Sequence, residues 1–108
     1  MIIAEFIKKD NYLIGFKVSG HANFDGYGHD IVCASVSSAV QLVCNTISEC
    51  FKNADAKISV DENYGISLKL IDTPIGDPCY TLIDGLKLHL EVLSEDFPKT
   101  INLKITEV

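Results

Sequence analysis

Apolar and polar residues alternate along two short stretches near the start of the chain, residues 2–7 and 12–19. Alternation places successive side chains on opposite faces, which is typical of a strand that buries one face. The first stretch places Ile3 and Ile7 on one face and Ile2, Ala4 and Phe6 on the other, and the second stretch places Ile14, Phe16 and Val18 on one face. Because a polar turn at residues 8–11 joins them, the two stretches are predicted to form a hairpin.

The spacing of apolar residues changes to three and four from Ile31 to about Lys52, which predicts a helix. Its apolar positions are Val32, Val36, Ala39, Val43, Ile47 and either Cys50 or Phe51. Asp30 stands directly before this stretch and is a good N-cap, because its carboxylate can accept a hydrogen bond from a first-turn amide. The helix is apolar over much of its surface, so we expect it to be largely buried.

Three more strands are expected in the second half of the chain. Residues 57–62 and 66–71 flank a turn at residues 63–65 that contains asparagine and glycine, which predicts a second hairpin. The last strand is expected over residues 100–107. One face of this strand consists of Ile101, Leu103 and Ile105.

A second helix is predicted to begin at Asp77 and Pro78, a capping residue followed by proline at the first helical position. Pro98 stands just beyond its expected end. Its apolar stripe consists of Leu82, Ile83, Leu86, Leu90, Leu93 and Phe97. The resulting order, β-β-α-β-β-α-β, predicts an α+β fold in which two helices pack on a single sheet of about five strands.

Composition and charge narrow the class of protein. The chain has 108 residues, of which 47% are hydrophobic and 22% charged, and its net charge is -6. This length and apolar content predict one domain that spans residues 1–108. We expect no direct nucleic-acid binding, because the chain is acidic and has no lysine-rich patch to neutralise phosphates. Long-range attraction would instead favour a basic peptide or protein.

The first ten residues alternate like a strand and do not form a charged leader followed by an apolar run. We also expect no apolar stretch long enough to cross a bilayer. The protein is therefore expected in the cytoplasm, without a membrane partner. Its 4 cysteines include no C-x-x-C pair and are expected to be thiols in a reducing compartment.

Reactive side chains concentrate in residues 20–38, between a predicted strand end and a predicted helix start. If Asp30 is the N-cap, Cys33 is the third residue of the helix, where unpaired amides and the positive end of the helix dipole favour a thiolate. Its neighbours Ala34 and Ser35 are small and leave access for a substrate, and first-turn amides are candidates for an oxyanion hole. The alternative interpretation, a buried and inert Cys33, has about equal support.

His21 follows Gly20 at the end of the second strand and lies twelve positions before Cys33, far enough for the loop to fold back. A histidine there can serve as base to the thiol and as acid to a leaving amine, although an ordinary surface histidine is the simpler interpretation. Ser37 lies one turn beyond Cys33 on the same helix face, as a hydrogen-bond partner or a small packing residue. Besides capping, Asp30 is a candidate for orienting a catalytic group.

The loop before the helix allows other interpretations. Gly26 and Gly28 make a mobile lid plausible, and His29 is expected to be mostly solvated. The rival chemistry is a metal site, with candidate ligands His21, Asp25, His29, Asp30 and Cys33. Because their spacing matches no strong zinc signature, we expect no metal and no cofactor.

The other cysteines are weaker candidates. Cys44 and Cys50 lie on or beside the buried face of the long helix and are interpreted as core residues. Cys79 begins the second helix and competes with Cys33, but no histidine lies near it in sequence. His89 is expected to be an exposed helical residue.

This chain resembles the Prp family of ribosomal-processing cysteine proteases in a signature that consists of Gly20-His21-Ala22, a short glycine-containing loop, Asp30-Ile31-Val32-Cys33-Ala34 and Ser37. The chain length and the order of elements are similar as well. The resemblance implies that Cys33 and His21 are the catalytic pair, with possible support from Asp30 and Ser37. Ser35 stands where we expect alanine, a small change that should not stop catalysis. The loop at residues 23–29 does not match residue by residue.

The resemblance also implies a function and a partner. Prp proteases remove a short N-terminal extension from a bacterial large-subunit ribosomal protein, cutting after an aromatic residue. A homodimer built on a mixed sheet is implied too. The main alternative is a non-catalytic, ribosome-associated assembly or binding factor with the same fold, which would need neither a reactive Cys33 nor His21. A metal-binding domain is the third possibility.

Overall fold

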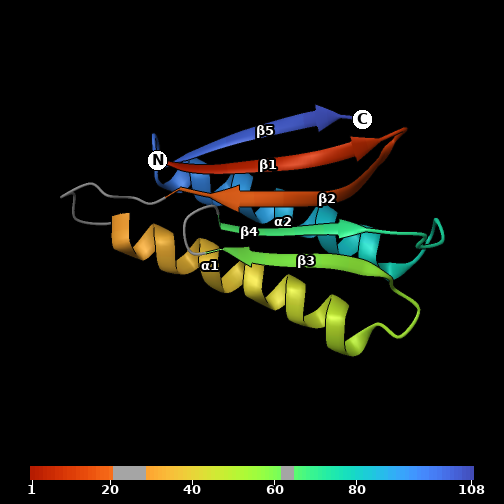
Figure 1. Ribbon diagram of the computed structural model, residues 1–108. Coiled ribbons are helices and arrows are strands. Elements are labelled where there is room, and N and C mark those ends of the chain that lie inside the picture. The colour runs from red at the N-terminus through yellow and green to blue at the C-terminus, as the bar shows by residue number, and fades with distance from the viewer. Residues whose placement is uncertain (21–28, 62–64) are drawn as a thin grey trace.

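The predicted order of strands and helices is confirmed by the computed structural model, which describes residues 1–20, 29–61 and 65–108, with only the backbone described at residues 29 and 30. Its elements, shown in Figure 1, are β1 (Ile2–Lys9), β2 (Tyr12–Ser19), α1 (His29–Asn45), a π-helical turn η1 (Thr46–Cys50), β3 (Ala56–Asp61), β4 (Gly65–Leu70), α2 (Pro78–Asp96) and β5 (Ile101–Glu107). The fold is α+β.

The five described strands form one mixed sheet in the order β3-β4-β2-β1-β5. β5 pairs with β1 in parallel, and the other neighbours are antiparallel. The register aligns Phe6 with Phe16, and Phe16 in turn with Leu68. Because aligned residues share a face, the apolar side chains of separate strands form one continuous apolar surface.

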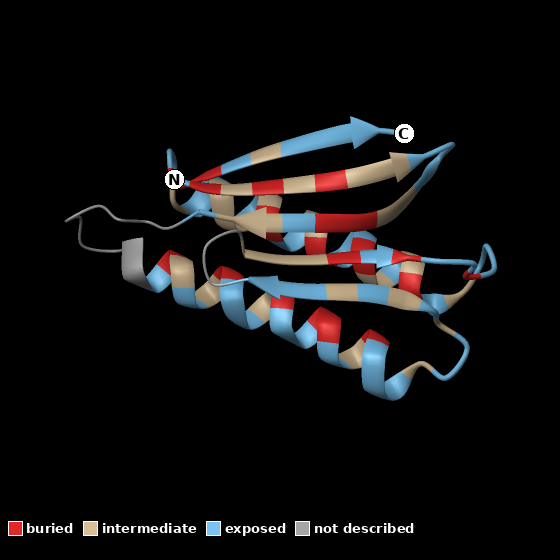
Figure 2. Cartoon of the chain, viewed as in Figure 1, coloured by how far each residue is buried: buried red, intermediate tan, exposed pale blue. Residues whose placement is uncertain are grey.

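Both helices pack on this apolar face. Buried residues of α1 and α2 belong to the same core cluster as the apolar face of the strands. Figure 2 shows buried positions alternating with less buried ones along β1. The opposite face of the sheet carries exposed polar residues such as Lys17, Lys57 and Lys69. The molecule therefore has two layers, a sheet and a pair of helices.

The predicted facing of one strand residue, Ile14, is wrong. Ile7 pairs with Gly15 whereas Lys8 pairs with Leu13, so a bulge leaves Ile14 as an extra residue in β2. As a result Leu13, and not Ile14, packs against the core among the described residues. A single inserted residue reverses the facing of everything beyond it, and strict alternation cannot reveal it.

The first helix starts and ends differently from the prediction. It begins at His29, so Asp30 is its second residue and not the N-cap. At the other end η1 widens the turn, and the Phe51 amide donates to the Thr46 carbonyl at 3.2 Å. Because a π turn holds more residues than an α turn, Cys50 rotates out into solvent. Phe51 takes the core position instead, so the assignment of Cys50 to the core is wrong.

The expectation that this helix is largely buried is also wrong. Only 33% of the segment Ile31–Cys50 is buried, because one stripe faces the sheet and residues such as Leu42, 65% exposed, face outward. The segment has 20 residues and a mean hydropathy of 1.5, which is long and apolar enough, by length and composition alone, to cross a membrane. The prediction that no stretch reaches this length is therefore corrected.

The second helix confirms its prediction at both ends. The Asp77 carboxylate caps α2 by accepting a hydrogen bond from the Cys79 amide at 3.0 Å. At the other end, the Phe97 amide donates to the Leu93 carbonyl at 3.0 Å. The predicted stripe packs on the core, with Ile83 and Leu90 fully buried.

Candidate active site

A cleft of about 230 Å³ lies beside Cys33, between the first half of α1 and the central strands. We call it the Cys33 cleft, and its described lining consists of Ile2, Val18, Ser19, Gly20, Cys33, Val36, Ser37, Val40, Gly65 and Ile66. None of these side chains is charged. Val36 and Val40 follow Cys33 at spacings of three and seven, so one face of α1 supplies an entire wall. The cleft suits an uncharged, apolar side chain of a ligand.

Cys33 is half-buried and packs against the core. Because α1 begins at His29, Cys33 is the fifth helical residue and lies two residues further into the helix than expected. The unpaired amides belong to the turn before it. Since side chains on a helix lean toward its N-terminus, the Cys33 side chain projects back over that turn. The thiol thus lies between the apolar cleft and the polar start of the helix.

Two glycines allow the strands to close around the cleft. Gly20 has φ of 93°, and a Cβ built on it would lie 2.5 Å from the Met1 carbonyl oxygen. Gly65 also has φ of 93°, and its Cβ would overlap the Val18 carbonyl oxygen. Such positive φ angles and such close backbone approach are open only to glycine. Gly20 therefore turns the chain out of β2 toward His21, and Gly65 brings β4 against the end of β2.

Ser37 lines the same cleft as Cys33, so the structure brings these two candidate residues together. The Ser37 hydroxyl accepts a hydrogen bond from Gln41 Nε2 at 3.1 Å, one turn further along α1. With its oxygen engaged in this way, the serine has its own proton available to donate toward the cleft.

The remaining candidates lie outside the described residues. These are His21 with the lid glycines Gly26 and Gly28, and the side chains of His29 and Asp30. The rival metal site depends mostly on the same residues. Across the part of the chain that the structure describes, no three His, Cys, Asp or Glu residues gather into a metal-binding group.

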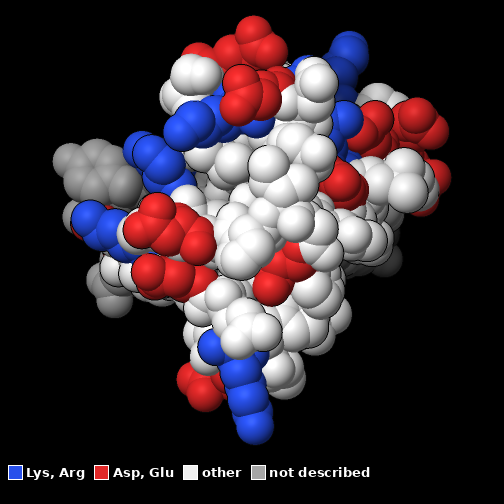
Figure 3. Space-filling model, turned by 90° about the vertical axis from the view of Figure 1, so that its right-hand side faces the viewer, with Lys and Arg blue, Asp and Glu red and all other residues white. Residues whose placement is uncertain are grey.

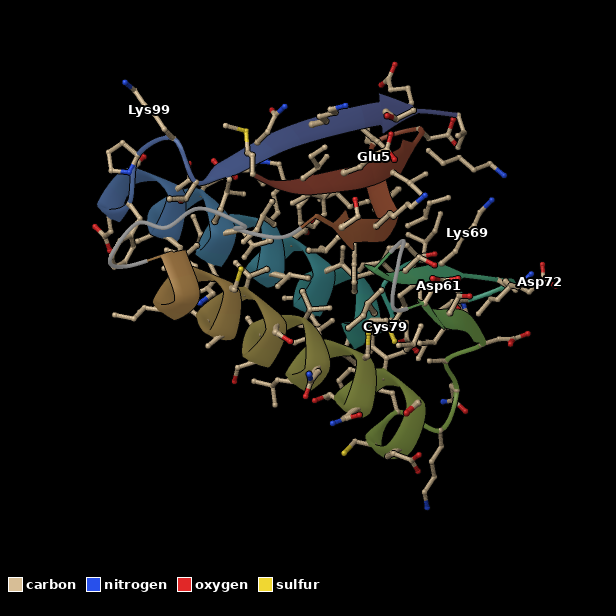
Figure 4. All side chains as sticks on the ribbon, turned by 60° about the vertical axis from the view of Figure 1, so that its left-hand side comes forward. Glu5, Asp61, Lys69, Asp72, Cys79 and Lys99 are labelled. Carbon is tan, nitrogen blue, oxygen red and sulfur yellow. The ribbon has the colours of Figure 1, made fainter. Side chains whose placement is uncertain are left out.

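Burial separates Cys33 from its main competitor. Cys79 is fully buried, between α2 and the sheet (Figure 4). Burial, together with the hydrogen bond and negative charge of Asp77, raises the pKa of its thiol to about 12. Burial also raises the pKa of Cys44. Cys50 is exposed and does not line the Cys33 cleft. A protonated, inaccessible thiol cannot be a nucleophile, so Cys79 is a core residue.

Most of the cleft lining was not found by sequence reasoning. Val36 was predicted as a helix core residue and Val40 was not singled out; their spacing from Cys33 is the signal that would have placed both beside it. Gly65 and Ile66 come from a strand thirty residues away, and only the pairing of β4 with β2 brings them to the cleft. Ile2 arrives through the β1–β2 pairing in the same way.

The charge distribution at the end of the molecule that carries the β1–β2 turn does not indicate a second site. Figure 3 shows the end that carries the β1–β2 turn and the C-terminus. Basic and acidic side chains intermix on that face, around an uncharged centre. A mixed surface of this kind gives no strong field of one sign.

A half-buried cysteine near the start of a helix, set in the wall of an apolar cleft, is a candidate thiol nucleophile. The family model described as cysteine protease Prp matches residues 1–102, so the chain belongs to the Prp family of cysteine proteases. The protein is accordingly an enzyme, a thiol-dependent peptide hydrolase.

Named relatives agree with this assignment. The chain is 27% identical over 101 residues to the ribosomal processing cysteine protease Prp of Bacillus subtilis, covering 90% of this chain and 88% of the relative. It is 29% identical over 87 residues to the Staphylococcus aureus protein of the same name, covering 80% of each. A crystal structure of S. aureus Prp with a substrate peptide has a TM-score of 0.86 and 23% identity, covering 98% of this chain and 100% of that one. This last likeness shows the shared fold.

Proposed function

We propose that this protein is a cytoplasmic processing endopeptidase that removes a short N-terminal extension from a bacterial large-subunit ribosomal protein. The observation that carries the proposal is the position of Cys33 in the wall of an uncharged cleft. The names of the curated relatives, ribosomal processing cysteine proteases, support the class of substrate. No cofactor is required, because the thiol and an imidazole supply the chemistry.

The proposed mechanism begins with attack of the Cys33 thiolate on the scissile carbonyl. Unpaired amides in the first turn of α1 stabilise the oxyanion of the tetrahedral intermediate. The C–N bond then breaks, and protonated His21 donates its proton to the departing amine, which leaves a thioester on Cys33. His21 next takes a proton from water as the water attacks the thioester. Collapse of this second intermediate releases the carboxylate product and restores Cys33 with His21 protonated.

Asp30 and Ser37 are proposed as supporting residues. Ser37 lines the Cys33 cleft and can donate to a substrate carbonyl while its oxygen accepts from Gln41. Asp30 stands in the first turn of α1 and is proposed to orient His21. The partners in this proposal are the ribosomal-protein extension and, as the family resemblance implies, a second copy of the chain.

Cleavage of a peptide that spans the candidate extension tests the proposal. Wild type should cut it once, whereas Cys33→Ala and His21→Ala should lower kcat/KM by at least about 1,000-fold, as expected for members of one catalytic unit. Cys50→Ala is the matched control, since Cys50 is exposed and should be dispensable. An uncut peptide would leave the non-catalytic assembly factor as the better account, and full activity in Cys33→Ala would show that Cys33 is not the nucleophile.

The residue before the scissile bond provides a second test with wild-type enzyme alone. The uncharged cleft should accept phenylalanine there and reject aspartate or lysine. Burying such an apolar side chain is worth about 1.5–3 kcal/mol, so charged variants of the peptide should lose roughly 10- to 200-fold in kcat/KM. Equal cleavage of all three peptides would exclude the Cys33 cleft as the pocket for this residue.

A further inference from the structure

The face of the sheet that points away from the helices carries a group of lysines. We call it the exposed sheet face. Four strands each contribute one lysine to it, namely Lys57 of β3, Lys69 of β4, Lys17 of β2 and Lys104 of β5. All four residues are exposed, and Figure 4 shows Lys69 directed away from α1 and α2. Both described helices pack on the other side of the sheet, so neither covers this face.

Strand pairing sets the spacing of these lysines. Lys57 lies directly opposite Lys69 on the neighbouring strand. Lys69 is paired in turn with Gly15 of β2, and Lys17 lies two residues further along that strand. Lys104 lies in the same row as Lys17, with β1 between them. Because neighbouring strands lie about 4.8 Å apart, the charges cross the sheet diagonally at intervals of about 5–10 Å, which suits a linear polyanion better than one compact anion.

The carboxylates on this face do not neutralise the lysines. Within the described parts of the chain, none of the four lysines forms an ion pair. The described strands add Glu5 and Asp61 to the same face, and the Glu5 carboxylate accepts a hydrogen bond from the Thr106 hydroxyl at 2.6 Å. Like charges directly opposite each other on a sheet are destabilising, so an anion bound between Lys57 and Lys69 relieves their repulsion.

A hollow of about 580 Å³ adjoins the lysines at one end of the sheet. We call it the tyrosine hollow, because Tyr12 and Tyr80 line it together with Lys69. The two rings meet edge to face with their centroids 5.6 Å apart, and the Tyr80 hydroxyl donates to the Thr73 carbonyl at 2.8 Å. Tyr80 therefore supports Tyr12, which is 40% exposed and leaves part of its ring open to a ligand.

The tyrosine hollow suits an uncharged, planar group. Its charged side chains balance, with Lys9 and Lys69 against Asp10 and Asp72. Nucleic-acid bases stack on exposed aromatic rings, and a carboxylate can accept a hydrogen bond from the amino group of cytosine. An acidic peptide would instead bring its carboxylates against the two aspartates. The hollow therefore favours a nucleic acid over an acidic peptide as the polyanion.

We propose that the exposed sheet face binds a single-stranded nucleic acid, with phosphates on the four lysines and a base in the tyrosine hollow. The acidic sequence, which lacks a lysine-rich segment, predicts no direct nucleic-acid binding. On this face, however, each lysine comes from a different strand, and only strand pairing brings them together. The proposal goes beyond the protease function and does not depend on it, because none of these lysines lines the Cys33 cleft.

Fluorescence anisotropy of a labelled, single-stranded oligocytidine RNA tests the role of the lysines. Wild type should bind it, and the logarithm of the affinity should fall against the logarithm of salt concentration with a slope of about −2 to −3, as expected for three or four phosphate contacts. Lys57→Glu and Lys69→Glu should each weaken binding at least about tenfold and flatten this slope. Lys52→Glu is the matched control, because Lys52 is an exposed lysine outside the sheet and its substitution changes the net charge equally. It should bind nearly as tightly as wild type.

The tyrosine hollow has its own variant. Tyr12→Ala should weaken binding at least about fivefold without changing the salt slope, because it removes stacking and no phosphate contact. Tyr12→Phe keeps the ring and should bind like wild type.

Three results would overturn the inference: no binding by wild type at low salt, a Lys69→Glu variant that binds as tightly as wild type, or competition by polyglutamate as effective as that by unlabelled RNA. Peptide cleavage on the same samples separates this inference from the proposed function. A wild type that cuts the peptide without binding RNA removes the nucleic-acid site alone, and one that binds RNA and leaves the peptide intact removes the protease function alone. Circular dichroism should show that all variants remain folded.

Discussion

Depth in the fold determines what each cysteine can do. Cys33 and Cys79 both stand near the start of a helix, which gives them similar neighbours in sequence. Cys79 is sealed between α2 and the sheet, with its pKa raised to about 12 by burial and by Asp77. Cys33 is half-buried and opens onto a cleft. At the residue scale, access distinguishes the proposed nucleophile from the core thiol.

Gly65 offers a direct test of how the Cys33 cleft is built. Gly65→Ala should destabilise the fold by about 1–3 kcal/mol more than Gly76→Ala. Both glycines have positive φ, 93° and 96°, so both substitutions strain the backbone. Only at Gly65 does the new Cβ also meet a backbone carbonyl, that of Val18, whereas at Gly76 it meets nothing within 4 Å. Urea unfolding of the two variants measures the difference, and equal losses would contradict the close approach of β4 to β2.

At the scale of elements, local signals account for what the sequence could predict. Three predicted features follow from residues that are close in sequence: the start of α2 at Asp77 and Pro78, its apolar stripe, and the alternation of β1. All three are confirmed. The bulge at Ile14 and the π turn at η1 each add one residue to a repeating pattern. Periodicity alone cannot reveal such insertions.

The residues of the candidate site divide in the same way, into those that local spacing predicts and those that it does not. Cys33 and Ser37 were placed together correctly because helical spacing is local. Gly65 and Ile66 were missed, because strand pairing brings them to the cleft from a separate hairpin. The start of α1 was predicted two residues late, since Asp30 looks like a cap and no local signal marked His29 as helical.

The α2 cap predicts a pH dependence of stability. Hydrogen bonds from the Cys79 side chain and, to a smaller extent, from the Cys79 backbone amide lower the pKa of Asp77 below its ordinary value of 3.8. A depressed pKa contributes stability that is present above pH 3.8 and lost as pH falls through the lower, folded value. Asp77→Asn should keep a cap without the titration, so its melting temperature should fall less than that of wild type between pH 5 and pH 3.

Asp77→Ala is the control for the cap itself. It should melt below wild type at pH 7, where Asp77→Asn stays close to wild type, because alanine cannot accept the Cys79 amide hydrogen bond. Parallel acid profiles for wild type and Asp77→Asn would show that this carboxylate has no part in the pH dependence.

At the scale of the whole molecule, α1 is shared between two surfaces. One face carries Cys33 and lines the Cys33 cleft, and the next face packs on the sheet. The outer face lines an apolar groove between α1 and α2. The apolar character of this helix, which reaches the length and hydropathy of a membrane span, follows from these combined demands.

Self-association, which the proposed function includes, predicts a concentration-dependent melting temperature. A second copy that binds the folded chain but not the unfolded chain stabilises the fold by mass action. The melting temperature of wild type should therefore rise over a 100-fold increase in protein concentration, by an amount equivalent to at most about 2.7 kcal/mol. A wild type that melts at one temperature throughout would contradict the dimer.

The central claim is that Cys33 is the nucleophile of a processing protease. Its most direct test is a peptide of the candidate extension in which the scissile amide is replaced by a chloromethyl ketone, followed by peptide mapping of the modified protein. The account predicts one covalent adduct on Cys33, its formation slowed by competing substrate, with the exposed Cys50 unmodified on the same timescale. An adduct on Cys50, or none on Cys33, would contradict it.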